Sequence, residues 1–341
     1  IDWIHTAQDQ GDVVREYTKW DDQPHTVASV PESFARAYRV ATTPPYGPVY
    51  LVFDSNLQED PLLVEVPMLD PKRLVAPDPS ALSANTVEKI ADMLVAAKRP
   101  VALADMVGQS QAAVDKLVEL AELLAIPVVD GGRRMNFPNT NRLDVTDYRD
   151  VFKDADLLFG VEVRDFERAL TTLNRTTRER TPIIPDDCKI IDLSYRDAAI
   201  KSWAQTFLKI YEVDVFATAD PTIALGQVID AVKAKLGSSH AGPIKERAEK
   251  IGVIHDNLRA GWAERAKDGW DSKPGMWEVR DAEIWCTGKS KEKNWLIWRK
   301  EQPADFILRL EFRWDKGNSG VQVRSDDLGK WQVFGYQAEV A

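Results

Sequence analysis

Cysteine, histidine and long apolar runs are all scarce in this chain of 341 residues. Its two cysteines, Cys188 and Cys286, lie far apart, so we expect no disulfide framework. Neither they nor the four histidines have the spacing of a zinc site. No apolar stretch approaches the roughly eighteen residues that a membrane-spanning helix needs, and the sequence therefore predicts none.

Positive charge is also in deficit. Lysine and arginine number 44 against 54 aspartates and glutamates, which gives a formal net charge of −10. Because nucleic acid and anionic membranes repel an acidic surface, we expect neither as a partner. The hydrophobic content of 44% and the charged content of 29% are typical of a globular protein with two or three domains. No signal-peptide pattern is visible, so we expect a cytoplasmic protein. Because the chain begins at Ile1 and already looks like the inside of a domain, we interpret it as a fragment.

The stretch from Lys98 to Gly132 has the pattern of a βαβ unit. A short apolar run, Val101 to Ala104, predicts a strand that is buried on both faces. Ser110 is placed to cap a helix, within which apolar residues recur at helical spacing. A second apolar run, Ile126 to Val129, predicts the next strand, parallel to the first.

Further signals extend this unit into an α/β domain over residues 85–240. Asp156 to Val161 and Lys189 to Leu193 read as further buried strands, and Asp220-Pro221 opens a helix that ends at Gly237. The fold class is therefore α/β, a doubly wound, Rossmann-like parallel sheet.

The segments on either side of this domain predict other kinds of structure. Residues 1–60 contain one helix with Phe34 and Tyr38 on its apolar face and one buried strand, which we interpret as the carboxyl-terminal part of a larger α/β domain. Residues 61–84 hold five prolines and read as a linker. Residues 241–274 read as a polar, helical linker.

Beyond Pro274 the apolar period changes from 3.6 to 2. Apolar and polar residues alternate in Asp305 to Trp314, and again in the strands that flank a turn at 318–320 and end at Ala341. This alternation predicts an antiparallel sheet with one buried face, so residues 275–341 form a partial β domain. The chain stops in mid-strand, and we expect this domain to be truncated.

Three passages together resemble thiamine diphosphate-dependent enzymes of the acetolactate synthase and benzoylformate decarboxylase type. They are VREYTKW (14–20) with RAYRVA (36–41) and GPVYLVFD (47–54), AAKRPVALADMVGQS (96–110), and DADLLFGVEV (154–163). The resemblance implies the end of a pyrimidine-binding domain, followed by the family's central domain. It further implies thiamine diphosphate and Mg²⁺ as cofactors, a 2-keto acid or similar substrate, and a homodimer or tetramer.

The sequence departs from that family at its catalytic motifs. The glutamate that protonates the aminopyrimidine would lie upstream of these residues, and no Gly-Asp-Gly…Asn motif for the diphosphate and Mg²⁺ occurs. We therefore expect no thiamine-dependent turnover by this chain alone. Some relatives hold FAD or ADP in the central domain, and Gly108, Gly131 and Gly132 are the candidates for such contacts here. They do not form a Gly-x-Gly-x-x-Gly motif, and a structural role is the alternative.

The β domain resembles the 3-keto-disaccharide hydrolase family, a jelly-roll or concanavalin-like sandwich. The matching passages are WEV (277–279), LEFRWDKGNSGVQVRS (310–325) and GYQAEV (335–340). The resemblance implies that a carboxylate removes the C2 hydrogen of a 3-keto-glycoside, while donors stabilise the enolate. The candidates for this sugar site are residues on the predicted solvent-exposed faces of the strands. The candidate base is Glu339, with Glu311 as a second catalytic candidate, and the substrate-binding candidates are Asn318, Arg324, Gln337 and Arg313.

Simpler interpretations stay open. Glu311 and Arg313 are equally explained as the solvated face of a strand, and residues 318–320 as an ordinary turn. Eight of the 11 tryptophans gather between Trp262 and Trp331, and they could stack on sugar but suit a core as well. We interpret the chain as two incomplete enzymes that meet near Pro274, either as a fusion or as an artefact of the gene model. The alternatives are a hydrolase in which only the β domain is catalytic, or a non-enzymatic protein that binds nucleotide and carbohydrate.

Overall fold

The structure is a computed structural model that describes most of the chain. Described are residues 7, 9–63, 65–66, 68–132, 134–195, 210–267, 269–280, 283–287, 295–299, 319–329 and 332–340. For residues 262–267, 319, 322–329 and 332–340 the description is of the backbone. In this described part, no helix is both long enough and apolar enough to cross a bilayer.

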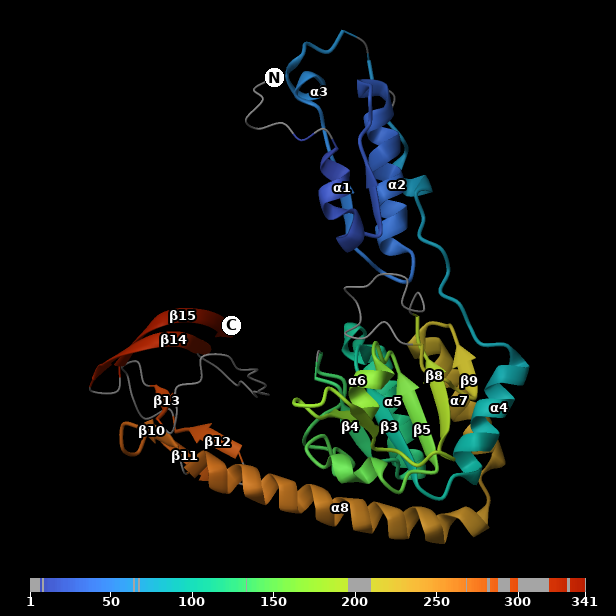
Figure 1. Cartoon of the computed structure of the whole chain (residues 1–341), viewed down its shortest axis with the longest axis vertical. Helices are drawn as coiled ribbons and strands as arrows, with labels where there is room; N and C mark the ends of the chain where they lie inside the picture. Colours follow the sequence, from blue (N-terminus) through green and yellow to red (C-terminus); the bar gives the residue numbers. More distant parts are fainter. Residues whose placement is uncertain are drawn as a thin grey trace.

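A parallel sheet of five strands forms the centre of the molecule (Figure 1). Its strands are β3 (Pro100–Ala104), β4 (Val128–Asp130), β5 (Leu157–Val161), β8 (Lys189–Leu193) and β9 (Val215–Ala217). They lie in the order β4-β3-β5-β8-β9, and every neighbouring pair is parallel. The predicted strands of the α/β domain are thus confirmed, whereas β9 has no counterpart among the predicted strands.

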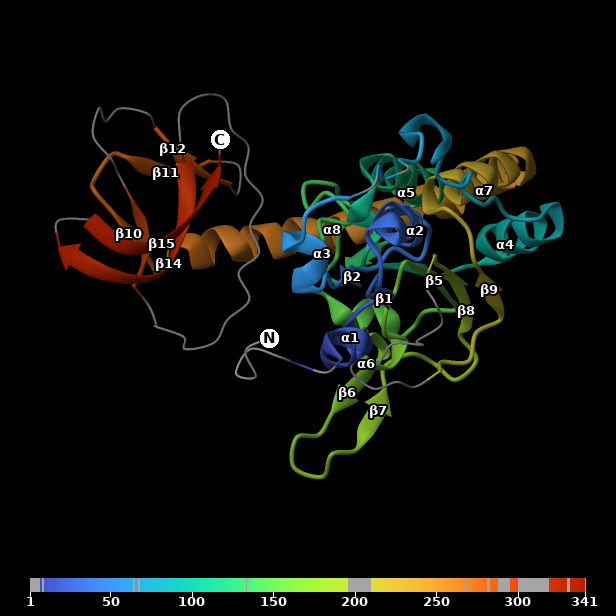
Figure 2. The ribbon, with the colours of Figure 1, turned by 90° about the horizontal axis from the view of Figure 1, so that it is seen from above.

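Three helices cover one face of this sheet (Figure 2). They are α4 (Ala84–Ala96), α5 (Gln111–Leu124) and α7 (Pro221–Lys235), and both α4 and α5 pack against α7. Ser110 caps α5 as predicted, because its Oγ accepts a hydrogen bond from the Ala113 N–H at 3.3 Å. The core of this domain consists of many buried apolar side chains. Its most deeply buried bulky side chains are Phe152, Phe159, Ile90, Leu94, Leu117, Leu120, Leu124, Ile126, Leu158, Leu170, Ile191 and Leu193.

A hairpin extends from the opposite side of the domain (Figure 2). After β5 the chain forms the short helix α6 (Phe166–Leu170) and then the antiparallel strands β6 (Thr171–Leu173) and β7 (Arg180–Pro182). The sequence analysis did not predict this hairpin, because its strands are short and mostly polar and give no clear alternation.

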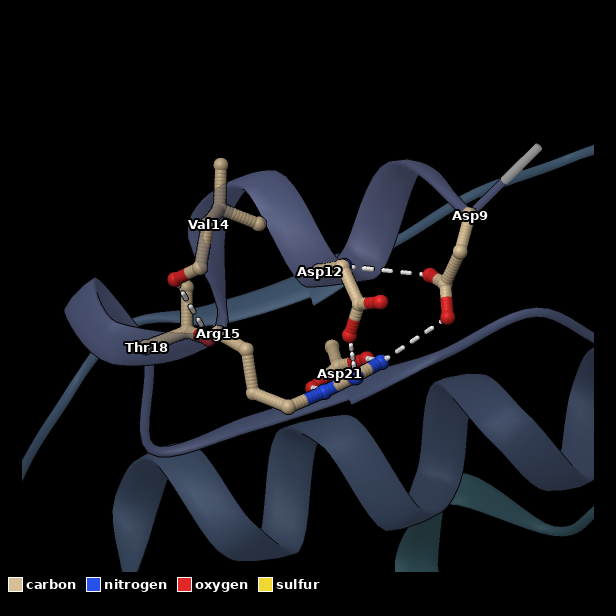
Figure 3. A network of polar contacts seen from close by, with 6 residues as sticks. All are labelled: Asp9, Asp12, Val14, Arg15, Thr18 and Asp21. Carbon is tan, nitrogen blue, oxygen red and sulfur yellow. Dashed lines mark hydrogen bonds and ion pairs between the residues drawn. The ribbon is translucent and has the colours of Figure 1, made fainter. Parts of the chain in front are cut away.

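The amino-terminal part is a small α/β unit. It consists of α1 (Gln10–Val14), β1 (Trp20–Asp22), α2 (Val30–Thr42), β2 (Val49–Leu51) and α3 (Ser55–Glu59), and β1 pairs in parallel with β2. Arg15 ties α1 to β1, as Figure 3 shows. Its Nη2 lies 2.8 Å from the Asp21 Oδ2 and 3.5 Å from the Asp9 Oδ2, and Nη1 contacts Asp12. The hydrogen bond with Asp21 raises the pKa of Arg15 above its ordinary value.

The predicted apolar face of α2 is only partly buried. Ala37 is buried, but the side chains of Phe34 and Tyr38 are 55% and 56% exposed. The physical reason is that the two-stranded sheet beside α2 is too narrow to cover a whole helix face. Phe34 finds one partner, the ring of Phe53, at a centroid distance of 5.6 Å.

Residues 61–84 contain, among those described, a single turn of 3-10 helix at Pro71–Arg73 and otherwise no regular structure until α4 begins. On the other side of the domain, α8 (Ser238–Lys267) is one continuous helix. It begins three residues before 241, the predicted start of the helical linker, and includes Pro243 close to its amino terminus. His255 on α8 is 1% exposed, and its Nδ1 lies 2.8 Å from the Asp144 carbonyl oxygen, so α8 packs against the central domain.

The last part of the chain is antiparallel, as predicted. β10 (Trp270–Ser272) pairs with β13 (Leu296–Trp298), and β11 (Trp277–Arg280) pairs with β12 (Glu283–Cys286). β14 (Ser319–Gly329) pairs with β15 (Gln332–Val340). These strands fit part of a β-sandwich. Within 318–320, Ser319 and Gly320 belong to β14 rather than to the predicted turn, because they pair with Val340 and Glu339.

Candidate functional site

The strand order places the topological switch point of the sheet at the carboxyl ends of β3 and β5. At a switch point, the chain leaves two neighbouring strands in opposite directions along the sheet. In open parallel sheets, ligands bind at the carboxyl ends of these two strands. The chain leaves β3 at Asp105 and leaves β5 at Glu162. Both residues are buried, so two acidic groups lie below the surface at the switch point.

Asp105 is paired with a cation from the neighbouring loop. Its Oδ2 accepts hydrogen bonds from the backbone N–H of Arg164 at 3.2 Å and from the Arg164 Nε at 3.3 Å. The two side chains are 11% and 18% exposed. A buried carboxylate needs such a partner, because leaving it unpaired would cost several kcal/mol, on the order of 3–5. The pair therefore neutralises the charge next to β3.

Glu162 has a backbone conformation that is rare for a residue with a side chain. Its φ is +53°, in the left-handed region. Its Oε1 accepts a hydrogen bond from the Tyr195 N–H at 2.7 Å, and the Tyr195 hydroxyl in turn accepts one from the Ser80 N–H at 2.8 Å. These contacts join the end of β5, the segment after β8 and the linker. The sequence analysis missed Glu162, and the only local signal is an acidic residue directly after a buried apolar run.

The three glycines that were predicted to contact a cofactor lie at this edge of the sheet. Their N–H groups already have acceptors inside the protein. Gly108 donates to the Asn136 Oδ1 at 3.0 Å, Gly131 to the Ala104 carbonyl at 2.6 Å, and Gly132 to the Asp130 Oδ1 at 2.6 Å. A diphosphate could use these N–H groups only by displacing those bonds.

The space beside two of the glycines is also filled. A Cβ atom at Gly108 would lie 2.4 Å from the Met135 carbonyl oxygen, and one at Gly131 would lie 2.9 Å from the Asp105 Oδ1. Both positions therefore need glycine for close packing of the chain on itself. This explains why glycine occurs there without any ligand.

Asp130 and Asn136 organise the loop that follows β4. The Asn136 side chain is fully buried, and its Nδ2 donates to the Asp130 Oδ1 at 2.7 Å. The Asp130 N–H donates to the Thr146 Oγ1 at 3.0 Å, and that hydroxyl donates to the Asp144 Oδ1 at 2.5 Å. The Asp144 carbonyl then accepts from His255, so one connected network runs from the glycine loop to α8.

The described residues do not fit the magnesium and diphosphate of thiamine diphosphate. Among them, no three His, Cys, Asp or Glu side chains come together in a way that could hold a metal ion. Thiamine chemistry also needs a hard cation with oxygen ligands for the diphosphate. We therefore derive no step through this cofactor.

A shallow hollow lies where the loop after β3 faces the amino-terminal unit. Its volume is about 550 Å³. The residues around it are Ala41, Tyr46, Gly47, Gly108, Gln109 and Arg134.

The predicted sugar site falls partly outside the described residues. Glu311, Arg313 and Asn318 lie outside them. Arg324 belongs to β14, and Gln337 and Glu339 belong to β15. The register pairs Gln337 with Gln322 and Glu339 with Gly320, and it shifts between Val323 and Asp326, where Arg324 lies. The three strand residues therefore come from two adjacent strands, as the alternation predicted.

Comparison with known proteins identifies two parts of the chain. Residues 87–228 match the family model of the thiamine pyrophosphate enzyme central domain. Residues 256–341 match the model of the 3-keto-alpha-glucoside-1,2-lyase-like domain. The chain thus contains a thiamine pyrophosphate enzyme central domain, followed by a 3-keto-disaccharide hydrolase-like domain. The second match begins at residue 256, within α8. The β domain was predicted to begin later, at residue 275.

Two solved structures of thiamine-dependent enzymes are similar to part of the chain. One is a thiamin diphosphate-dependent enzyme from Mycobacterium smegmatis, with 22% identity, a TM-score of 0.48, and coverage of 63% of this chain and 40% of that one. Another is benzoylformate decarboxylase from Polynucleobacter necessarius, with 18% identity, a TM-score of 0.47, and coverage of 63% and 38%. The chain thus spans well under half the length of either structure. No curated protein sequence matches the chain.

Proposed function

We propose that residues 87–228 are the non-catalytic middle of a thiamine diphosphate-dependent enzyme that makes or breaks a carbon–carbon bond beside a keto group. The observation that carries this proposal is the match over these residues, together with a parallel sheet in the order β4-β3-β5-β8-β9. The polar groups that line the carboxyl edge of that sheet bond to one another. Such an edge suits a scaffold that positions catalytic domains.

It follows that the 341-residue chain has no thiamine-dependent turnover of its own. The test is to incubate the purified chain with thiamine diphosphate, Mg²⁺ and a 2-keto acid, such as benzoylformate, and to measure CO₂ release. Calorimetric titration with thiamine diphosphate should show no binding, and thermal unfolding of the same sample verifies that the chain is folded. Steady CO₂ release above the rate without protein would overturn the proposal.

A second candidate function lies in the β domain, and it is favoured by the match over residues 256–341. This candidate is cleavage of a 3-keto-glycoside. The ketone at C3 acidifies the C2 hydrogen, so a carboxylate can remove that proton to form an enolate. The electron pair then forms the C1–C2 double bond while the C1–oxygen bond breaks, and the aglycone leaves as an alcohol.

In this candidate Glu339 is the base, and Arg324 with Asn318 holds the enolate oxygen. Glu311 is the second catalytic candidate, and Arg313 and Gln337 are the further substrate-binding candidates. Release of the aglycone from a 3-keto-glycoside, followed by chromatography, tests this function independently of the thiamine experiment. A rate equal to that of the uncatalysed reaction would exclude it for this chain.

A further inference from the structure

The hairpin of β6 and β7 is held rigidly at its base. The Arg180 Nη1 donates to the Glu167 carbonyl at 3.3 Å and also contacts the Thr171 hydroxyl. The Ile183 N–H donates to the Leu170 carbonyl at 2.9 Å. These bonds connect both strands of the hairpin to α6 and to the body of the domain.

The tip of the hairpin is ordered by its own hydrogen bonds. Asn174 accepts at Oδ1 from the N–H of Thr176 at 2.9 Å, and its carbonyl accepts from the Arg178 N–H at 2.8 Å. The Asn174 N–H donates to the Glu179 carbonyl at 2.9 Å. The tip is therefore preorganised, and a partner would not have to pay for ordering it.

Exposed arginines gather on this hairpin and on the helix that leads into it. Arg168, Arg175 and Arg178 are exposed, and none of them forms an ion pair with another described residue. Glu179 is the one exposed acid beside them at the tip. A cationic projection is unusual on a chain with a net charge of −10. We refer to these three arginines as the arginine hairpin.

An acidic surface, opposite in charge to the arginine hairpin, lies on the amino-terminal unit. Asp54 and Asp60 flank α3, and Glu59 ends it. All three are exposed, and within the described chain none of them forms an ion pair. Figure 2 shows α3 apart from the hairpin. We refer to these three acids as the α3 corner.

We infer that the arginine hairpin is an interaction surface for a second copy of this chain, and that it docks against the α3 corner of that copy. Guanidinium groups bind carboxylates in bidentate fashion, so two arginines carried on one ordered hairpin can bind a pair of acids. In a symmetric dimer, each copy would give its hairpin to the other and receive the other's hairpin in return.

Charge reversal tests this contact with the complete chain. The double variant R175E/R178E lowers the formal net charge from −10 to −14, since each reversal removes two charges. The variant K72E/R73E makes the same change at two exposed residues of the linker and is the matched control. Sedimentation velocity measures the dimer Kd. It is run at about 10 mM salt, where the Debye length is roughly 30 Å and charges on the two copies are little screened.

We expect the wild-type chain to dimerise at low salt and to dissociate toward about 1 M salt. R175E/R178E should weaken the dimer by about tenfold or more relative to K72E/R73E. The variant E59K/D60K should weaken it similarly. An equimolar mixture of the two reversed variants should regain dimerisation, because each acidic hairpin then meets a basic corner.

Three results would overturn the inference. The first is a monomer at every salt concentration. The second is a dimer that R175E/R178E and K72E/R73E affect equally, since the chain would then associate through another surface. The third is a failure of the mixed reversed variants to associate while circular dichroism shows both of them to be folded.

Discussion

Arg247 on α8 donates to the carbonyl of Leu124, the last residue of α5, through both Nε and Nη2, with the Nε at 3.2 Å. The same Nε lies 3.1 Å from the Ala125 carbonyl. A helix leaves its last carbonyls without partners, and a cation there also matches the helix dipole. A residue of α8 therefore completes the central βαβ unit.

Removal of this cap should destabilise the chain. We expect Arg247→Ala to lower the free energy of unfolding by about 1.5–3 kcal/mol, the range for hydrogen bonds to a charged group. Arg247→Lys should recover only part of the loss, because an ammonium cannot span two carbonyls as the planar guanidinium does. Urea denaturation followed by circular dichroism measures both variants. Equal stability of Arg247→Ala and the wild type would contradict this role.

The buried carboxyl of Asp144 should make stability depend on pH. Burial raises the pKa of Asp144 above its ordinary value, against the lowering effect of the hydrogen bonds from Thr146. The folded state therefore holds the proton more tightly than the unfolded state. The resulting stability is present below the unfolded pKa of about 3.9 and is lost as the pH rises through the folded pKa.

Asp144→Asn removes this dependence and keeps an acceptor for Thr146. We expect the variant to gain stability relative to the wild type at pH 7, and the gain to shrink as the pH falls to 4. Urea unfolding across that range is the measurement, and Asp186→Asn at an exposed position is the control. The same pH profile in both variants would show that burial of Asp144 has no such effect.

Two Gly→Ala variants should act in opposite directions. At Gly108 the new Cβ would lie 2.4 Å from the Met135 carbonyl oxygen, so we expect a loss of about 1–3 kcal/mol. Gly226 in α7 has no atom within 4 Å of the corresponding position, and alanine there should stabilise the helix by about 0.4–1 kcal/mol. Denaturant midpoints distinguish the two, and an unchanged Gly108→Ala would show that the loop after β3 can move away.

The two cysteines should react with thiol reagents at very different rates. Burial, and then the nearby Asp156 and Asp187, raises the pKa of the Cys188 thiol to about 11. At pH 8 its thiolate fraction is then about a hundredfold below that of an ordinary thiol. Labelling with a chromogenic disulfide should show one fast phase from the exposed Cys286 and one slow phase. Loss of the slow phase, instead of the fast one, in Cys286→Ser would contradict the assignment.

Glu339→Gln tests the second candidate function. If Glu339 is the base, the variant should cleave a 3-keto-glycoside about 10²- to 10⁴-fold more slowly, because the amide cannot take the C2 proton. Glu278→Gln removes one exposed glutamate from another strand of the same part and should leave the rate unchanged. Initial rates of aglycone release compare the two variants, and equal rates would exclude Glu339 as the base.

Local signals were sufficient to predict the centre of the fold. Pro100 to Ala104 is buried at every position, and Ser110 caps the helix that follows, so the apolar runs and the cap residue alone determined the βαβ unit. The Asp220 cap of α7 was predictable for the same reason, because its acceptor bonds reach only to Thr222 and Ile223.

Features that depend on distant partners could not be predicted in this way. Phe34 and Tyr38 have the spacing of a buried face, yet how far they are covered depends on the number of strands beside α2. Glu162 takes its conformation from contacts with Tyr195, which is far away in sequence. Periodicity does not indicate which buried polar groups bond to each other. This is why the glycines looked open to a cofactor, although their N–H groups have acceptors within the protein.

The continuity of α8 has a practical consequence for dissecting this protein. The helix runs without a break through residue 256, where the second family match begins, and it brings Arg247 and His255 to the central domain on the way. A chain shortened at Gly237 would leave the Leu124 carbonyl facing water and the Asp144 carbonyl without its imidazole. The central domain should therefore be expressed with its trailing helix, at least as far as Arg259, whose guanidinium still reaches back to the Asn139 carbonyl.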